Sequence, residues 1–184
     1  TILSAATNLS EADTALSKNI HNLYDTSNEI SGKIESVSAE TQMNPWMYYN
    51  GNKEKGVVTK YGGCIASGSL SVAEGGGTSA IGNVSHAEGN SSHAVGDITH
   101  AEGLGTYASG TTSHAEGQGT YASGNISHAE GNISHSVGEI SHAEGNNTWA
   151  NGYISHSEGD GTYAIGYFSH SEGQRTYASG TTSH

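Results

Sequence analysis

Histidine and glutamate recur in this chain in the unit His-x-Glu, in which one residue separates the two. The unit returns every 14 residues, from His86 and Glu88 to His170 and Glu172. An imidazole beside a carboxylate can exchange protons, form a charge-assisted hydrogen bond or ligate a metal ion. The residues of this His/Glu ladder are His86, Glu88, His100, Glu102, His114, Glu116, His128, Glu130, His142, Glu144, His156, Glu158, His170 and Glu172.

The ladder lies inside a strict internal repeat. Gly recurs every seven residues from Gly68 to Gly180, seventeen times without interruption. Around it runs the heptad [S/T]-x-A-x-G-x-x, and alternate heptads differ, so the true repeat is 14 residues. A fixed internal period is the signature of a solenoid, in which each repeat forms one coil.

The heptad also predicts which residues face inward. Numbered 1 to 7 from the Ser or Thr, positions 1, 3 and 5 are small, whereas positions 2 and 4 are large. Because side chains alternate along a strand, the small residues would line a narrow interior and the large ones would point outward. Each coil is then two short strands and two turns, and Gly at position 5 suits a positive φ or a close backbone approach.

Residues 1–41 carry a different heptad. Ile2, Leu9, Leu16, Leu23 and Ile30 are seven residues apart, and residues four further on are partly apolar. This pattern predicts a long helix in a coiled-coil stalk, and branched residues at both seam positions favour three strands over two. The alternative is an amphipathic helix that packs on its own domain.

Residues 42–63 are an aromatic-rich connector. Met47-Tyr48-Tyr49 and Val57-Val58-Thr59 are typical of strands, and Asn50-Gly51 favours a turn, which together predict a small hairpin. The repeats then fill residues 64–184. Packing between the two regions is the simpler role for the aromatic side chains, and a binding pocket is the alternative.

Composition excludes several partners. The formal net charge is −12, and from residue 64 onward Arg175 is the only basic side chain against eleven acidic ones. Such a surface repels phosphate backbones, so we expect no nucleic acid partner. No apolar run approaches the length of a membrane span, so we expect no membrane insertion in this segment. Cys64 is the only cysteine, which leaves no intrachain disulfide to predict. The chain starts at Thr1 and ends within a repeat at His184, as expected for a fragment of a longer protein.

The pattern S-x-A-x-G-x-x-S-x-A-x-G resembles the YadA-like head of trimeric autotransporter adhesins, over about two thirds of the chain. The resemblance implies a homotrimeric, left-handed parallel β-roll. The variant SHAEG…TYASG also resembles repeats in tail-fibre proteins of phages and prophages. Two departures are that the adhesin head prefers Val and Ile where this chain has His and Glu, and that it usually precedes the stalk. A stalk that comes first favours the phage-type fibre.

Four roles for the His/Glu ladder remain open. Its uniformity predicts a uniform environment, and we place it at the trimer axis as a network of His–Glu hydrogen bonds between chains. A metal or anion site on the axis and a solvent-facing array that binds a repetitive ligand are alternatives. Catalysis is disfavoured, because identical copies in a line do not build one active site. We therefore assign no catalytic residue, no metal ligand and no cofactor.

The alternate strand varies between repeats and is the candidate outer contact face, with Tyr107, Tyr121, Trp149, Tyr163 and Tyr177. We expect a mostly β, non-enzymatic fibre segment with a structural and host-recognition role, which places it outside the cell on a virion tail. Its partner would be a host-surface glycan or protein. The alternatives are a surface adhesin of a bacterial cell, a spacer that binds nothing itself, and a polysaccharide-degrading tailspike. The tailspike is disfavoured because such thin coils offer no wide face for a pair of catalytic acids.

Overall fold

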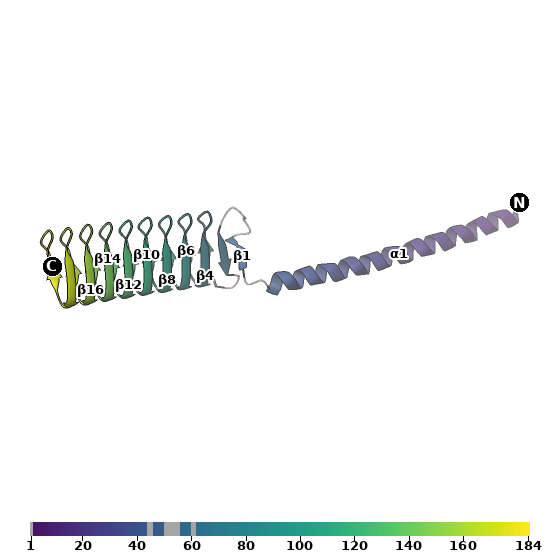
Figure 1. Cartoon of the computed structure of the whole chain (residues 1–184). Coiled ribbons are helices and arrows are strands. Elements are labelled where there is room, and N and C mark those ends of the chain that lie inside the picture. Colours follow the sequence, from purple (N-terminus) through teal and green to yellow (C-terminus); the bar gives the residue numbers. More distant parts are fainter. Residues whose placement is uncertain (1, 44–45, 50–55, 60–61) are drawn as a thin grey trace. The chain divides into compact units, whose positions relative to one another are not determined.

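The computed structural model describes residues 2–43, 46–49, 56–59 and 62–184. The chain divides into two compact units, Thr1–Asn44 and Pro45–His184. The first is a helix and the second is a parallel β solenoid with one coil per 14 residues (Figure 1). The helix and the mostly β solenoid predicted from the sequence are therefore confirmed.

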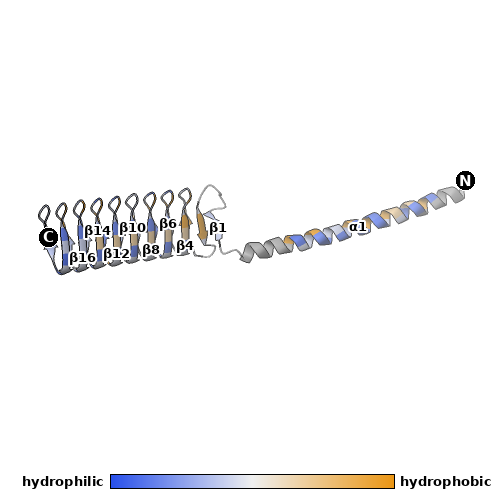
Figure 2. Ribbon diagram, viewed as in Figure 1, coloured by the Kyte–Doolittle hydropathy of each residue, from blue (hydrophilic) through white to orange (hydrophobic). Residues whose placement is uncertain are grey.

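The helix α1 runs from Ile2 to Met43. Apolar and polar residues are interspersed along it (Figure 2). The described apolar residues on the heptad seam are exposed. Leu9 is 72% exposed, Leu16 58%, Leu23 70% and Ile30 51%. No helix among the described residues is long and apolar enough to cross a membrane. The seam residues from Leu9 to Ile34 that the structure describes are thus uncovered within their own unit.

One face of the solenoid is a ten-stranded sheet in the order β1-β2-β4-β6-β8-β10-β12-β14-β16-β18. From β4 onward every strand has five residues and contains the His/Glu ladder or its equivalent. These strands are β4 (Val72–Gly76), β6 (His86–Asn90), β8 (His100–Leu104), β10 (His114–Gln118), β12 (His128–Asn132), β14 (His142–Asn146), β16 (His156–Asp160) and β18 (His170–Gln174).

The other face is a nine-stranded sheet of two-residue strands in the order β19-β17-β15-β13-β11-β9-β7-β5-β3. The strands are β3 (Ile65–Ala66), β5 (Ser79–Ala80), β7 (His93–Ala94), β9 (Tyr107–Ala108), β11 (Tyr121–Ala122), β13 (His135–Ser136), β15 (Trp149–Ala150), β17 (Tyr163–Ala164) and β19 (Tyr177–Ala178). Each coil therefore has two strands, as predicted, but of unequal length.

The connector supplies the first pair of the long-strand sheet. β1 (Trp46–Tyr48) pairs antiparallel with β2 (Val57–Thr59), and β2 pairs parallel with β4. The turn predicted at Asn50-Gly51 lies outside the described residues. The strands at this end of the solenoid are the most apolar, whereas the later coils are more polar (Figure 2). Among the described aromatic residues of the connector, Trp46 and Tyr48 are exposed, and Tyr49 packs against the core.

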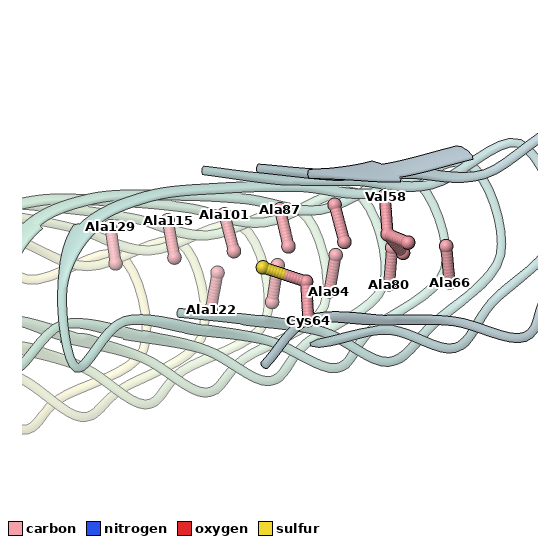
Figure 3. Close-up of a cluster of buried hydrophobic side chains, with 12 residues drawn as sticks. Val58, Cys64, Ala66, Ala80, Ala87, Ala94, Ala101, Ala115, Ala122 and Ala129 are labelled. Atoms are coloured by element: carbon pink, nitrogen blue, oxygen red, sulfur yellow. The ribbon is translucent and has the colours of Figure 1, made fainter. Parts of the chain in front are cut away.

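The interior is built from the small residues that the heptad places inward. Ala at position 3 has no exposed surface in nearly every coil, and the Ser or Thr at position 1 of most coils is buried beside it. Two rows of Ala methyl groups, including Ala101 and Ala115 in one row and Ala94 and Ala122 in the other, face each other across the coil (Figure 3). The sheets are consequently too close together for larger side chains.

Hydroxyl groups in this interior bond mainly to the backbone. Ser85 Oγ donates to the Gly82 carbonyl at 2.6 Å, and the same bond recurs at Ser113, Ser127, Ser155 and Ser169. Where position 3 is Ser instead of Ala, its hydroxyl pairs with the next position-1 hydroxyl, as between Ser157 and Thr162 at 2.7 Å. Most hydroxyl groups of the core are thereby hydrogen-bonded inside a coil that has little apolar surface.

Glycine at position 5 serves two geometries. In the long strands its φ is +101 to +112°, whereas in the short-strand heptads φ is not positive. In both places the backbone of the next coil is so close that a Cβ could not fit. A Cβ on Gly117 would lie 2.1 Å from the Gly131 carbonyl oxygen, and one on Gly124 would lie 1.9 Å from that of Gly138. The unbroken seven-residue glycine period follows from this stacking.

Position 7 is left-handed in every coil. From Gly63 to Thr182, each residue at this position has φ between +51 and +67°. This conformation directs the N–H along the solenoid, and from Gly77 onward it bonds to the carbonyl fifteen residues earlier at 2.6–3.0 Å, as Ile98 does to Asn83. These inter-coil bonds hold the strained backbone in place.

Candidate functional site

The His/Glu ladder forms one column of paired histidine and glutamate side chains on the outer surface of the long-strand sheet. Identical residues are paired in register, for example His114 with His128 and Glu116 with Glu130. The Ala between them points inward, so the imidazole and the carboxylate of one strand lie side by side. The histidine side chains are 32–38% exposed. We call each His-x-Glu strand a rung of the ladder.

Within each rung the imidazole Nε2 approaches the carboxylate without a short hydrogen bond. The Nε2–Oε2 separation is 3.5–3.9 Å from His86 to His170. Successive imidazole rings stack with centroids 4.8–4.9 Å apart and planes within 11° of parallel. Stacking thus fixes the ring orientation, and the ring nitrogens form a straight row.

Burial and neighbouring ladder residues shift the pKa of several ladder side chains. Burial lowers the pKa of His114 and His142, and the adjacent histidines lower both further. Burial also raises the pKa of Glu130, to which the carboxylates of Glu116 and Glu144 contribute. Both effects disfavour the charged forms, as expected for like groups stacked in a half-buried column.

The variable residues of the short-strand sheet form a second column. His93, Tyr107 and Tyr121 stack at 4.5 and 5.0 Å, and the row continues through His135 to Trp149 with centroids 4.9 and 3.8 Å apart. Tyr163 and Tyr177 extend it with wider spacing. All five predicted outer-face aromatics therefore lie in one row, on the sheet opposite the ladder.

A third column, at position 7 beside the ladder, was not identified from the sequence. It consists of Leu70, Val84, Ile98, Thr112, Ile126, Ile140, Ile154, Phe168 and Thr182, and we call it the apolar turn column. Its large apolar members are 40–80% exposed. A shallow groove separates Val84 and Ile98 of this column from the histidines of the ladder.

The apolar turn column is conformationally costly. A left-handed backbone is unfavourable for L-residues by about 1–2 kcal/mol, and β-branched residues are genuine outliers there. At the opposite turn, position 7 is Gly in five of nine coils, as at Gly105 and Gly119, which avoids the strain. The sequence signal was available, because an apolar residue occurs at nearly every fourteenth position from Leu70.

No family model matches the sequence, and no curated protein shows significant similarity to it. The fold and the three columns are therefore the basis for the functional argument. The placement of the ladder at a trimer axis stays a prediction.

Proposed function

We propose that this chain is a non-enzymatic, homotrimeric segment of a phage or phage-like tail fibre, with a structural and host-recognition role. The proposal rests on one observation: in both units, apolar side chains that recur at a regular spacing are exposed. On α1 these are the heptad residues from Leu9 to Ile30, and on the solenoid they are the apolar turn column. Each column needs a partner surface, and a second and third copy of the chain supply matching ones.

The helix supports three chains. Its exposed seam has the heptad spacing of a coiled coil, with Ile20 58% exposed and Ile34 61% exposed at the second seam position. Branched residues at both seam positions favour trimers. In the solenoid, the apolar turn column lies beside the ladder, so association through this edge would bring the His/Glu face toward the other chains.

The short-strand sheet would face away from the other chains and is therefore the surface that could contact a host glycan or protein. Its aromatic residues cover one another's ring faces from His93 to Trp149. Contact with a host glycan or protein would therefore come from ring edges and phenol hydroxyls rather than from ring faces. Binding of the labelled protein to bacterial cells, or to surface glycans extracted from them, tests this role.

The alternative is the head and stalk of a bacterial surface adhesin. The order of the two units favours the fibre, because the helix comes before the solenoid. The location of the gene separates the two: a position among phage structural genes supports the fibre, whereas a lone chromosomal gene supports the adhesin.

Association through the apolar turn column is tested by glycine substitutions. Ile126→Gly combined with Ile140→Gly relieves backbone strain but removes two side chains that the trimer would bury, each worth about 1.5–3 kcal/mol. We expect the double variant to melt at a lower temperature than the parent. We also expect the melting temperature of the parent to rise with protein concentration, as association requires.

Ile133→Gly is the matched control, because Ile133 has the same left-handed conformation, with φ of 54°, at the opposite turn. There the relief of strain and the added freedom of the unfolded chain nearly cancel, and we expect little change or a small gain. Equal behaviour of both turns, together with a melting temperature independent of concentration, would contradict the proposal.

A further inference from the structure

The Nε2 atoms of six ladder histidines are buried and have no hydrogen-bond partner among the described residues. They belong to His100, His114, His128, His142, His156 and His170. A buried polar atom without a partner costs free energy, and its repetition along a column calls for a physical explanation such as a bound ion or water. Each of these atoms lies beside a carboxylate, and this favours a bound cation over water.

The distances around His100 suit a metal ion better than a proton. Its Nε2 is 3.6 Å from Glu102 Oε2 and 3.8 Å from Glu88 Oε1. Both separations are too long for a hydrogen bond. Two metal–ligand bonds of about 2.1 Å can span at most about 4.2 Å, so an ion bound to His100 Nε2 is within reach of either carboxylate. The ring centroids of His100 and His114 are 4.9 Å apart, so successive histidines offer their nitrogens once per coil.

Adjacent rungs share a carboxylate. Glu88 places Oε2 3.9 Å from His86 Nε2 and Oε1 3.8 Å from His100 Nε2. One glutamate can thus bridge two successive ions. Groups of one glutamate and two flanking histidines, with ligand atoms within 4.8 Å of one another, recur along the column, for example at Glu116 and Glu130.

The charge of the column points to a cation. The ladder carboxylates stack without an intervening Lys or Arg, and the one basic residue after residue 64 is Arg175. An imidazole nitrogen together with carboxylate oxygens suits borderline divalent metals such as Zn²⁺, whereas Mg²⁺ and Ca²⁺ prefer oxygen ligands alone.

We propose that the His/Glu ladder binds a row of divalent metal ions of the Zn²⁺ class. Each ion is held by one histidine Nε2 and the carboxylate of its own rung. The carboxylate of Glu74 on β4 also reaches the ion at His86, and that of Glu88 reaches the ion at His100. All ligands come from one chain, so the proposal does not depend on the trimer.

Zn²⁺ titration of the complete chain, followed by calorimetry, tests the proposal. We expect saturable uptake of more than one Zn²⁺ ion per chain and no comparable uptake of Mg²⁺. Substituting Glu88→Gln, Glu102→Gln and Glu116→Gln together keeps side-chain size and stacking, so we expect the solenoid circular dichroism to persist while the number of bound ions falls. Co²⁺ should give visible absorption bands that the same variant weakens.

The matched control combines His21→Gln, His93→Gln and His135→Gln, which removes three histidines outside the ladder. We expect this variant to bind as many Zn²⁺ ions as the parent. Absence of saturable uptake by the parent at millimolar Zn²⁺ would overturn the proposal. So would unchanged uptake in the glutamate variant, or loss of uptake in the control, because either result assigns the binding to other groups.

Discussion

From Thr106 onward, the residue at position 3 decides whether the hydroxyl group of the Thr five residues later has a hydrogen-bond partner inside the coil. The buried Oγ1 atoms of Thr106, Thr120 and Thr148 have no hydrogen-bond partner among the described residues, and each Thr follows an Ala by five residues. Where that residue is Ser, as at Ser157 and Ser171, the two hydroxyls bond at 2.7–2.8 Å. The chain therefore contains both arrangements, one with Ala and an unpaired Thr hydroxyl and one with Ser and a paired Thr hydroxyl.

Ala115→Ser should stabilise the solenoid. The new hydroxyl would lie five residues before Thr120, in the arrangement that Ser157 has with Thr162. A buried hydroxyl that gains a partner contributes about 1 kcal/mol. We expect the free energy of unfolding, measured by urea denaturation, to rise by about that amount.

The reverse change supplies the comparison. Ser157→Ala would leave Thr162 in the state that Thr120 has in the parent, so we expect a loss of about 1 kcal/mol. A decrease in stability for Ala115→Ser would show that the interior has no room for the added oxygen.

Glycine substitutions separate crowding from backbone strain. At Gly124 a Cβ would meet the Gly138 carbonyl oxygen at 1.9 Å, and the rigid backbone of the next coil cannot move away. We expect Gly124→Ala to cost about 3 kcal/mol or more in thermal or urea unfolding.

Gly119→Ala is the control at a turn. There φ is +61° and the nearest atom to a Cβ is 3.9 Å away on Ile133, so only the left-handed penalty applies. That penalty is about 1–2 kcal/mol, partly offset by the reduced freedom of the unfolded chain. Equal losses at the two glycines would contradict the crowding argument.

At this scale the sequence predicted the inward residues correctly, because small side chains at positions 1, 3 and 5 leave no other choice. It did not predict the left-handed turns. Ile98 and Ile126 are β-branched, and such residues ordinarily avoid positive φ. Only the inter-coil hydrogen bonds, which involve residues fifteen apart, explain why they adopt it.

At the scale of the strand, the two heptads of a coil have the same small-residue pattern but different lengths of strand. The glycine of the long strand keeps the backbone extended at positive φ, as at Gly117, and pairing continues to the next residue. The glycine of the short-strand heptad, such as Gly124, begins the turn instead. Position 5 is Gly in both, so composition alone could not distinguish them.

Stacking in columns makes stability depend on pH. Burial lowers the pKa of His114, His135 and His142 below the usual 6.5. The folded chain therefore binds fewer protons than the unfolded chain just below pH 6.5. The stability that comes from keeping these histidines neutral is complete above that pH and is lost as the pH falls. Glu130 has the opposite effect on stability, because its pKa is raised. Near the pKa of a glutamate, the folded chain therefore binds more protons than the unfolded chain.

We therefore expect the melting temperature in EDTA to be lower at pH 5.5 than at pH 7.5. Replacing all three histidines with Gln should reduce the difference, because Gln does not titrate. An unchanged melting temperature between the two pH values would indicate that the histidines lie in a more hydrated environment than this structure gives them.

For the whole molecule, neither unit has the core of a globular domain. The solenoid interior is mostly Ala, Ser and Thr, and α1 has none of its described seam residues covered. Large apolar side chains lie instead on the outside, in columns with the period of their own element. A narrow coil of this kind buries little apolar surface and gains most from association.

The sequence predicted the N-terminal helix and the 14-residue solenoid, since periodicity of seven and fourteen residues is visible in the chain itself. It could not predict which outer face meets another chain. Alternation places His86 and Tyr107 outward equally well, and the choice depends on neighbours that a single strand does not encode. The apolar turn column, whose place beside the ladder follows from the stacking of the coils, favours the edge beside the ladder.

The mass of the assembled particle in solution tests the central claim most directly. Sedimentation equilibrium of the complete chain should give three times the 18.9 kDa mass of one chain. Three identical chains that cover the exposed apolar columns of both units would give that mass. A mass of 18.9 kDa, independent of concentration, would contradict the account.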